Sequence, residues 1–67
     1  MIQIQINSKD RQIPDGTSMA QLIQMLDLAN QRIAIEVNEE LVPRSTFESH
    51  LLTEKDRVEI IQAIGGG

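Results

Sequence analysis

The chain opens with strict alternation of apolar and polar residues. Isoleucine stands at positions 2, 4 and 6, and the residues between and after these positions are polar. Because successive side chains of a strand point to opposite faces, this pattern predicts a strand over 2–6 with its isoleucines on one face. Polar residues 7–10 predict a turn. Residues 11–13 are expected to return as a second strand that ends at Pro14, since proline lacks the backbone donor that a ladder needs.

A different period follows over 18–28. Apolar residues fall at helical spacing there, and they form a single stripe of Met19, Leu22, Ile23 and Leu26. Thr17 or Ser18 can cap the first turn with its hydroxyl group. The pattern therefore predicts a helix over 18–28, closed at Asn30-Gln31, whose stripe packs on the isoleucine face of the first strand.

Alternation returns in the second half of the chain. It predicts a third strand over 32–38, a short fourth strand at Leu41-Val42 before Pro43, and a last strand over 57–63. Residues 44–52 have no clean period, so we expect a loop with a short helical turn, anchored by Phe47 and by Leu51 or Leu52.

This order of elements predicts an α+β fold. One helix is expected to cover one face of a mixed sheet of four to five strands, with the first and last strands as neighbours. We divide the chain into a domain over 1–63 and a flexible C-terminal glycine tail over 64–67.

Composition narrows the possible functions. A chain of 67 residues has little room for a deep cleft, so an enzyme is not expected. The absence of cysteine excludes disulfides, thiolate metal sites and a catalytic thiol. The net charge is −4 and the basic residues are scattered, so nucleic acid is not an expected partner. No long apolar run or signal-peptide pattern is present, so we expect no membrane association and a cytoplasmic location.

The polar side chains of the body suggest no catalytic centre. His50 is the single histidine, and its neighbours Glu48 and Glu54 do not make a metal-ligand pattern, so no metal site is predicted. Glu36, Glu39 and Glu40 are interpreted as a solvated turn.

The candidate chemistry lies in the three glycines at the end of the sequence, Gly65, Gly66 and Gly67. A glycine tail lacks Cβ atoms and can enter a narrow channel, and four nearly extended residues reach roughly 13 Å. The carboxylate of Gly67 would be unhindered, and ATP could activate it as an acyl-adenylate. A sulfur nucleophile would then give a thiocarboxylate, and a lysine amine would give an amide. The glycines do not decide between these outcomes, and a frayed tail or cloning remnant is the other interpretation.

Segments along essentially the whole chain resemble the ThiS family of sulfur carriers in thiamin biosynthesis. The most specific segment is Val37-Asn38 together with Val42-Pro43-Arg44. The others are the opening strand Ile2–Ile6, the helix start at Gly16-Thr17, the strand Asp56-Arg57-Val58-Glu59-Ile60 and the terminal glycines. A terminus of three glycines instead of two is a small departure from the family pattern.

The resemblance implies a ubiquitin-like β-grasp fold and a protein co-substrate with no bound cofactor of its own. It implies that a ThiF-type enzyme adenylates Gly67 with ATP and Mg²⁺. A sulfur donor enzyme then supplies the thiocarboxylate sulfur, and a ThiG-type thiazole synthase uses it to form the thiazole ring of thiamin.

Docking contacts are expected near the tail. If Val58 and Ile60 face the helix, Ile61 and Ala63 face away from it. Together with Ile64 and Arg44 they are our candidates for contacting the partners. Three alternatives stay open: the small subunit of molybdopterin synthase, a ubiquitin-like protein modifier, and a simple β-grasp binding module.

Overall fold

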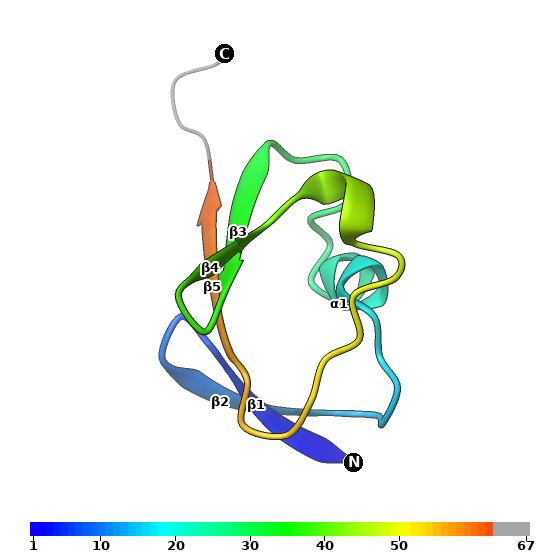
Figure 1. The fold of residues 1–67 in the computed structure, drawn as a ribbon, viewed down its shortest axis with the longest axis vertical. Coiled ribbons are helices and arrows are strands. Elements are labelled where there is room, and N and C mark those ends of the chain that lie inside the picture. The colour runs from blue at the N-terminus through cyan, green and yellow to red at the C-terminus, as the bar shows by residue number, and fades with distance from the viewer. Residues whose placement is uncertain (63–67) are drawn as a thin grey trace.

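The computed structural model of the chain describes residues 1–62 and shows a mixed sheet of five strands (Figure 1). The strands are β1 (Ile2–Ile6), β2 (Lys9–Ile13), β3 (Ile33–Val37), β4 (Glu40–Val42) and β5 (Arg57–Gln62), and their order is β2-β1-β5-β3-β4. The neighbours β1 and β5 are parallel, and the other pairs are antiparallel. The predicted mixed sheet, with the first strand beside the last, is therefore confirmed.

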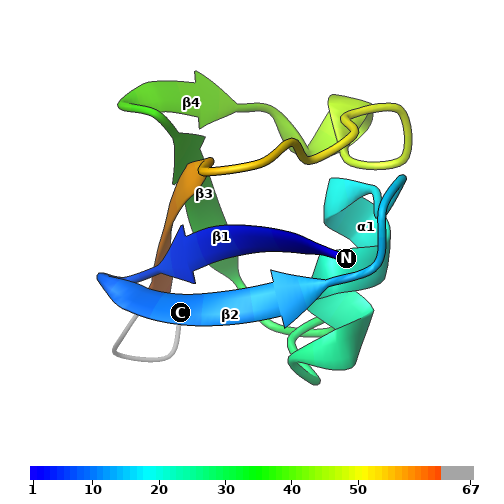
Figure 2. The same cartoon turned by 90° about the horizontal axis from the view of Figure 1, so that it is seen from below.

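The helix α1 (Met19–Met25) lies beside one face of this sheet (Figure 2). Its first turn is held by a capping box, in which Ser18 Oγ accepts from Gln21 N at 3.1 Å and Gln21 Oε1 accepts from Ser18 N at 2.9 Å. The helix is shorter than predicted, because the chain turns at Asp27 into the left-handed region with φ 61°. Leu26 and Leu28 still pack on the core, so the apolar spacing continues beyond the helical backbone.

The core fills the space between α1 and the sheet. Ile4, Ile35 and Val58 supply the inward side of three neighbouring strands, and Met19 and Leu22 supply the helix stripe. These apolar side chains provide the main free energy that holds the two layers together.

The connection from β4 to β5 closes the core at one side. It begins with the short 3-10 helix η1 (Arg44–Thr46), and the next residue, Phe47, is 6% exposed. The carbonyl of Phe47 accepts from Ala20 N at 2.9 Å, which ties the connection to α1. The expected loop with a helical turn is confirmed, and its anchors are Phe47 and Leu52, whereas Leu51 is exposed.

The β1–β2 and β3–β4 hairpins use turns of the same kind. Asn7 and Ser8 have φ values of 50° and 71°, and Asn38 and Glu39 have φ values of 52° and 71°. Positive φ at both central residues is characteristic of the two-residue I′ turn, which matches the twist of paired strands. For this reason β2 begins at Lys9, and the predicted four-residue turn with a strand start at position 11 is wrong.

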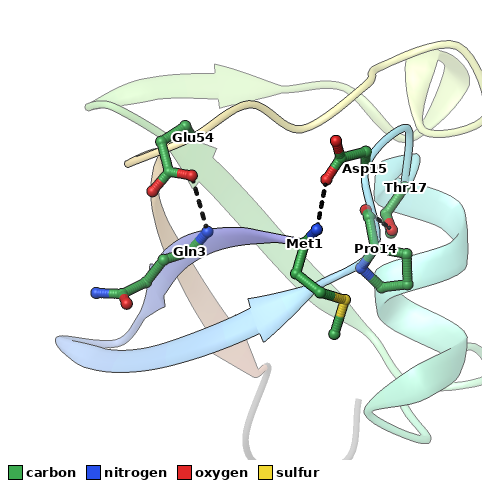
Figure 3. Close-up of polar contacts among 6 residues, drawn as sticks. All are labelled: Met1, Gln3, Pro14, Asp15, Thr17 and Glu54. Carbon is green, nitrogen blue, oxygen red and sulfur yellow. Dashed lines mark hydrogen bonds and ion pairs between the residues drawn. The ribbon is translucent and has the colours of Figure 1, made fainter.

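The first residues of the chain make polar contacts with neighbouring loops (Figure 3). They lie at one end of the sheet, and β5 finishes at the other end (Figure 1). The amino group of Met1 lies 3.0 Å from Asp15 Oδ1, and Gln3 N donates to Glu54 Oε1 at 3.2 Å. Nearby, Thr17 Oγ1 donates to the carbonyl of Pro14 at 2.6 Å (Figure 3). The contacts of Met1 and Gln3 lie at the surface and contribute little to stability, but they link β1 to the segments before α1 and before β5.

Candidate functional site

The central strand β5 leads to the predicted functional tail. On one side it pairs with β3 from Val37↔Val58 to Ile33↔Gln62. On the other side the register with β1 covers only Gln5↔Arg57 and Ile6↔Val58. The sheet therefore holds the base of the tail in its middle and not at an edge.

Most of the predicted site lies beyond this point. Residues 63–67, which include the expected attachment residue Gly67, its neighbours Gly65 and Gly66, and the docking candidates Ala63 and Ile64, lie outside the described residues. Their roles stay predictions, as does the division of the chain into a domain and a tail.

Ile61 is a docking candidate that the structure does describe. Val58 is 1% exposed and Ile60 packs on the core, so the expected inward parity of β5 is confirmed. Ile61 has the opposite parity, pairs with Ala34 of β3, and is 57% exposed on the face of the sheet away from α1. Its role in docking remains a prediction.

Ile61 belongs to a wider surface on that face, which we call the outward strip: Ala34, Glu36, Leu41, Glu59 and Ile61. The register aligns Glu36 with Leu41 on one side and with Glu59 on the other. Leu41 is 68% exposed. The strip is therefore apolar near Ile61 and Leu41 and acidic between them.

The positions of Glu36 and Glu59 in the outward strip differ from what the sequence alone indicates. Glu36 is not part of a solvated turn with Glu39 and Glu40, because it lies within β3 and is half-buried. The sequence does not show that Glu59 lies beside Glu36, since this depends on the register between strands that are far apart in the sequence. Alternation alone could have indicated only that each glutamate points outward.

Arg44 lies elsewhere on the molecule. Its Nη2 donates to the carbonyl of Gln31 at 3.3 Å, and its guanidinium carbon lies 5.7 Å from the centre of the Phe47 ring. It lines a hollow beside α1 together with Ala20 and Ile23. The structure thus places Arg44 on the helix side and Ile61 on the outward side, and does not bring the two together in one patch.

The buried polar groups of the described residues are paired within the protein. Within residues 1–62, no three histidine, aspartate or glutamate side chains come together as a metal site, and every buried polar side-chain atom has a hydrogen-bond partner. The backbone carbonyl of His50 accepts from Met19 N at 2.8 Å. In the same range, no helix is long and apolar enough to cross a membrane.

Comparisons with known proteins agree with this architecture. The model of the ThiS family matches residues 4–67. A protein of Porphyra purpurea called ycf40 is 41% identical over 66 residues, which are 98% of this chain and 93% of the relative. The sulfur carrier protein ThiS of Escherichia coli strain K12 is 29% identical over 98% of this chain and 100% of its own.

Two further similarities differ in kind. A thiazole synthase of Magnetococcus marinus is 32% identical over 66 residues, which cover 98% of this chain but 20% of that protein. The crystal structure of the thiamine biosynthesis protein ThiS from Geobacter metallireducens superposes with a TM-score of 0.84 at 23% identity, covering 98% of this chain and 100% of the other. The latter similarity establishes the β-grasp fold.

Proposed function

Because this chain belongs to the ThiS family, we propose that it carries sulfur for thiamin biosynthesis on the carboxylate of Gly67. The observation that carries the proposal is the family match over residues 4–67, which extends through the terminal glycines. The similarity to the E. coli sulfur carrier over that protein's full length supports it.

The proposed chemistry has two steps. A carboxylate oxygen of Gly67 attacks the α-phosphorus of ATP, the bond to the β-phosphate oxygen breaks, and pyrophosphate leaves. A hydrosulfide equivalent from a sulfur donor then attacks the acyl carbon, the bond to the AMP oxygen breaks, and a thiocarboxylate remains. A ThiF-type partner would bind the ATP with Mg²⁺, which offsets the phosphate charge. The carrier contributes an unhindered acyl group and the surface that the partner recognises.

The proposed acceptor of the sulfur is a ThiG-type thiazole synthase. In M. marinus a segment similar to this whole chain makes up 20% of a protein named thiazole synthase. Joining two modules in one chain raises the effective concentration of each toward the other and so promotes their contact, which is an advantage when the two act together. This supports the same pairing between separate chains here.

The test is an intact-mass measurement. The chain is incubated with ATP, Mg²⁺, a ThiF-type enzyme and hydrosulfide. We expect a mass gain equal to replacing one oxygen by one sulfur, and no gain when Gly67 is deleted. A Gly67→Ala variant should remain folded and react more slowly, because its methyl group narrows the fit in the partner's channel.

A reference ThiS protein in the same mixture controls for active enzyme. If the reference gains sulfur and this chain does not, the proposed function is wrong. Lysine-linked conjugates of the chain in cells would instead indicate a protein modifier. If the thiocarboxylate forms but a ThiG-type enzyme makes no thiazole from it, the chain would carry sulfur for another pathway, such as molybdopterin synthesis.

A further inference from the structure

The outward face of the sheet has no covering layer among the described residues. Their single α-helix, α1, lies beside the opposite face (Figure 2). On the outward face Leu41 of the edge strand β4 is 68% exposed, and Ile61 of the central strand β5 is 57% exposed. Single exposed apolar residues are ordinary on a protein surface, so these two indicate a docking surface only together with a second observation.

The second observation is the acidic pair between them. Glu36 of β3 and Glu59 of β5 are direct cross-strand neighbours, and Leu41 lies on the other side of Glu36. Like charges in this position destabilise a sheet. Glu36 is half-buried, so salt screens its charge less than that of a fully exposed carboxylate. The pair therefore weakens the isolated fold at the centre of the outward strip.

The cations of this chain do not neutralise the acidic pair. Within residues 1–62 the single ion pair lies elsewhere, at the amino terminus. Arg57 precedes Glu59 by two residues on the same face, but it lines a hollow with Gln5 and Asp10 and forms no ion pair with either glutamate. Residues 63–67 contain no basic side chain. A cation that pairs with both carboxylates therefore has to come from another molecule.

We propose that the outward strip docks the adenylating partner, and that this partner places an arginine or lysine side chain between Glu36 and Glu59 and apolar side chains over Leu41 and Ile61. This inference rests on the proposed function. Gly67 follows Ile61 by six residues, so an enzyme that acts on its carboxylate must come within about 20 Å of Ile61. Charge complementarity favours this partner over a second copy of the chain, because two strips face to face would bring four carboxylates together.

The proposal gives Glu59 opposite effects on folding and on docking. In Glu59→Lys the new ammonium group lies beside Glu36, so the isolated protein should be at least as stable as the wild type. The same ammonium group would repel the cation of the partner and weaken docking. A residue with a purely structural role would change stability and docking in the same direction.

Binding to a ThiF-type enzyme tests the inference, with calorimetry for Kd and adenylation kinetics for kcat and KM. In Glu59→Lys we expect Kd and KM to rise about 10- to 50-fold and kcat at saturating carrier to stay within about twofold, because Gly67 is unchanged. Glu59→Gln and Glu36→Gln should give smaller rises of about three- to tenfold. Glu48→Lys is the matched control. Glu48 is exposed and lines the hollow beside α1, so the same charge change there should leave Kd within about twofold.

The salt dependence of binding gives a second readout. Between about 50 and 200 mM salt, the Kd of the wild type should rise more steeply than that of the double variant Glu36→Gln/Glu59→Gln. The double variant has lost the charges on which the salt acts. Parallel salt curves would mean that no cation of the partner faces the acidic pair, and would overturn the inference.

The remaining outcomes separate the docking site from the proposed function. Equal weakening in Glu48→Lys and Glu59→Lys would reduce the effect to net charge and overturn the docking site. Normal adenylation with a loss of thiazole formation would assign the strip to the ThiG-type enzyme instead. A wild-type dimer in sedimentation that Ile61→Ser abolishes would make a second copy the occupant. A wild-type chain that is not adenylated at all, beside an active reference carrier, would refute the proposed function, and the docking of this partner would fall with it.

Discussion

Asp56 is a carboxylate that lies inside the protein and is satisfied entirely by neighbouring turns. It is 7% exposed, and its oxygens accept from Thr53 N at 2.9 Å, Thr53 Oγ1 at 3.0 Å and Asn38 Nδ2 at 3.1 Å. Its own carbonyl accepts from Gln5 N at 2.9 Å. This single residue therefore joins the turn before β5, the β3–β4 turn and β1.

Replacing Asp56 should destabilise the fold more than replacing an exposed carboxylate would. Asp56→Ala leaves three donors without their acceptor, and we expect the free energy of unfolding to fall by about 2–3 kcal/mol. Urea denaturation followed by circular dichroism measures the change. Asp10→Ala on the exposed side of β2 is the control and should stay within about 0.5 kcal/mol. A similar small change in Asp56→Ala would contradict the assigned role.

Ile61 is the residue whose surface role can be separated from stability. Its side chain is 57% exposed, so Ile61→Ser removes little core packing. If partners dock on the outward strip, the KM for adenylation should rise by about fivefold or more. Met25→Ser changes an apolar side chain that is 45% exposed on the helix side, and should leave KM within about twofold. Equal KM values for both variants would remove Ile61 from the docking surface.

Alternation along the chain predicts the elements well and their ends less well. β1, β3 and β5 follow directly from it, because one face of each is buried under α1. The first turn and the end of the helix do not follow, since both depend on left-handed residues. Asn7, Ser8 and Asp27 adopt positive φ, and polarity alone does not show which residue of a polar segment will do so.

The register between β3 and β5 produces an unfavourable pair that composition cannot show. Glu36 and Glu59 are direct cross-strand neighbours on the outward face, and like charges in this position repel. Glu59→Lys should therefore stabilise the protein by about 0.2–1 kcal/mol at low ionic strength, and the gain should shrink in salt. Denaturation at two salt concentrations measures this.

Glu59→Gln is the partial control for that prediction, because it removes the repulsion without adding attraction. It should give a smaller gain than Glu59→Lys. If the lysine variant is no more stable than the wild type, the repulsion between the two glutamates has no energetic effect.

For the molecule as a whole, the sequence predicts the chemistry of the terminal glycines more readily than it predicts which residues lie together on the surface of the folded body. The terminal glycines and the family segments can be recognised along one chain, so they predict a carrier. The outward strip is formed by residues that are far apart in sequence and meet through strand pairing. The hydrogen bond from Ile60 N to Asn7 Oδ1 likewise joins two distant segments. Alternation does not determine this register.

The proposed division into body and tail is tested by truncation. The buried cluster of the described chain runs from Ile4 to Val58, so removal of 65–67 should leave the free energy of unfolding within about 0.5 kcal/mol. The same truncation should abolish adenylation. A loss of more than about 1 kcal/mol on truncation would mean that the tail belongs to the folded body.

The central place of β5 also has a consequence for how the protein is made. The β1–β2 and β3–β4 hairpins lie on opposite sides of β5 in the sheet and are joined through it. Contact between Gln5 and Arg57 spans nearly the whole chain, so this closure is the most non-local event in folding. Without β5, the β1–β2 and β3–β4 hairpins have no strand between them to join them into one sheet, and an isolated two-stranded hairpin is only marginally stable in water. The sheet can therefore close only after β5, the last strand in the sequence, has been synthesised.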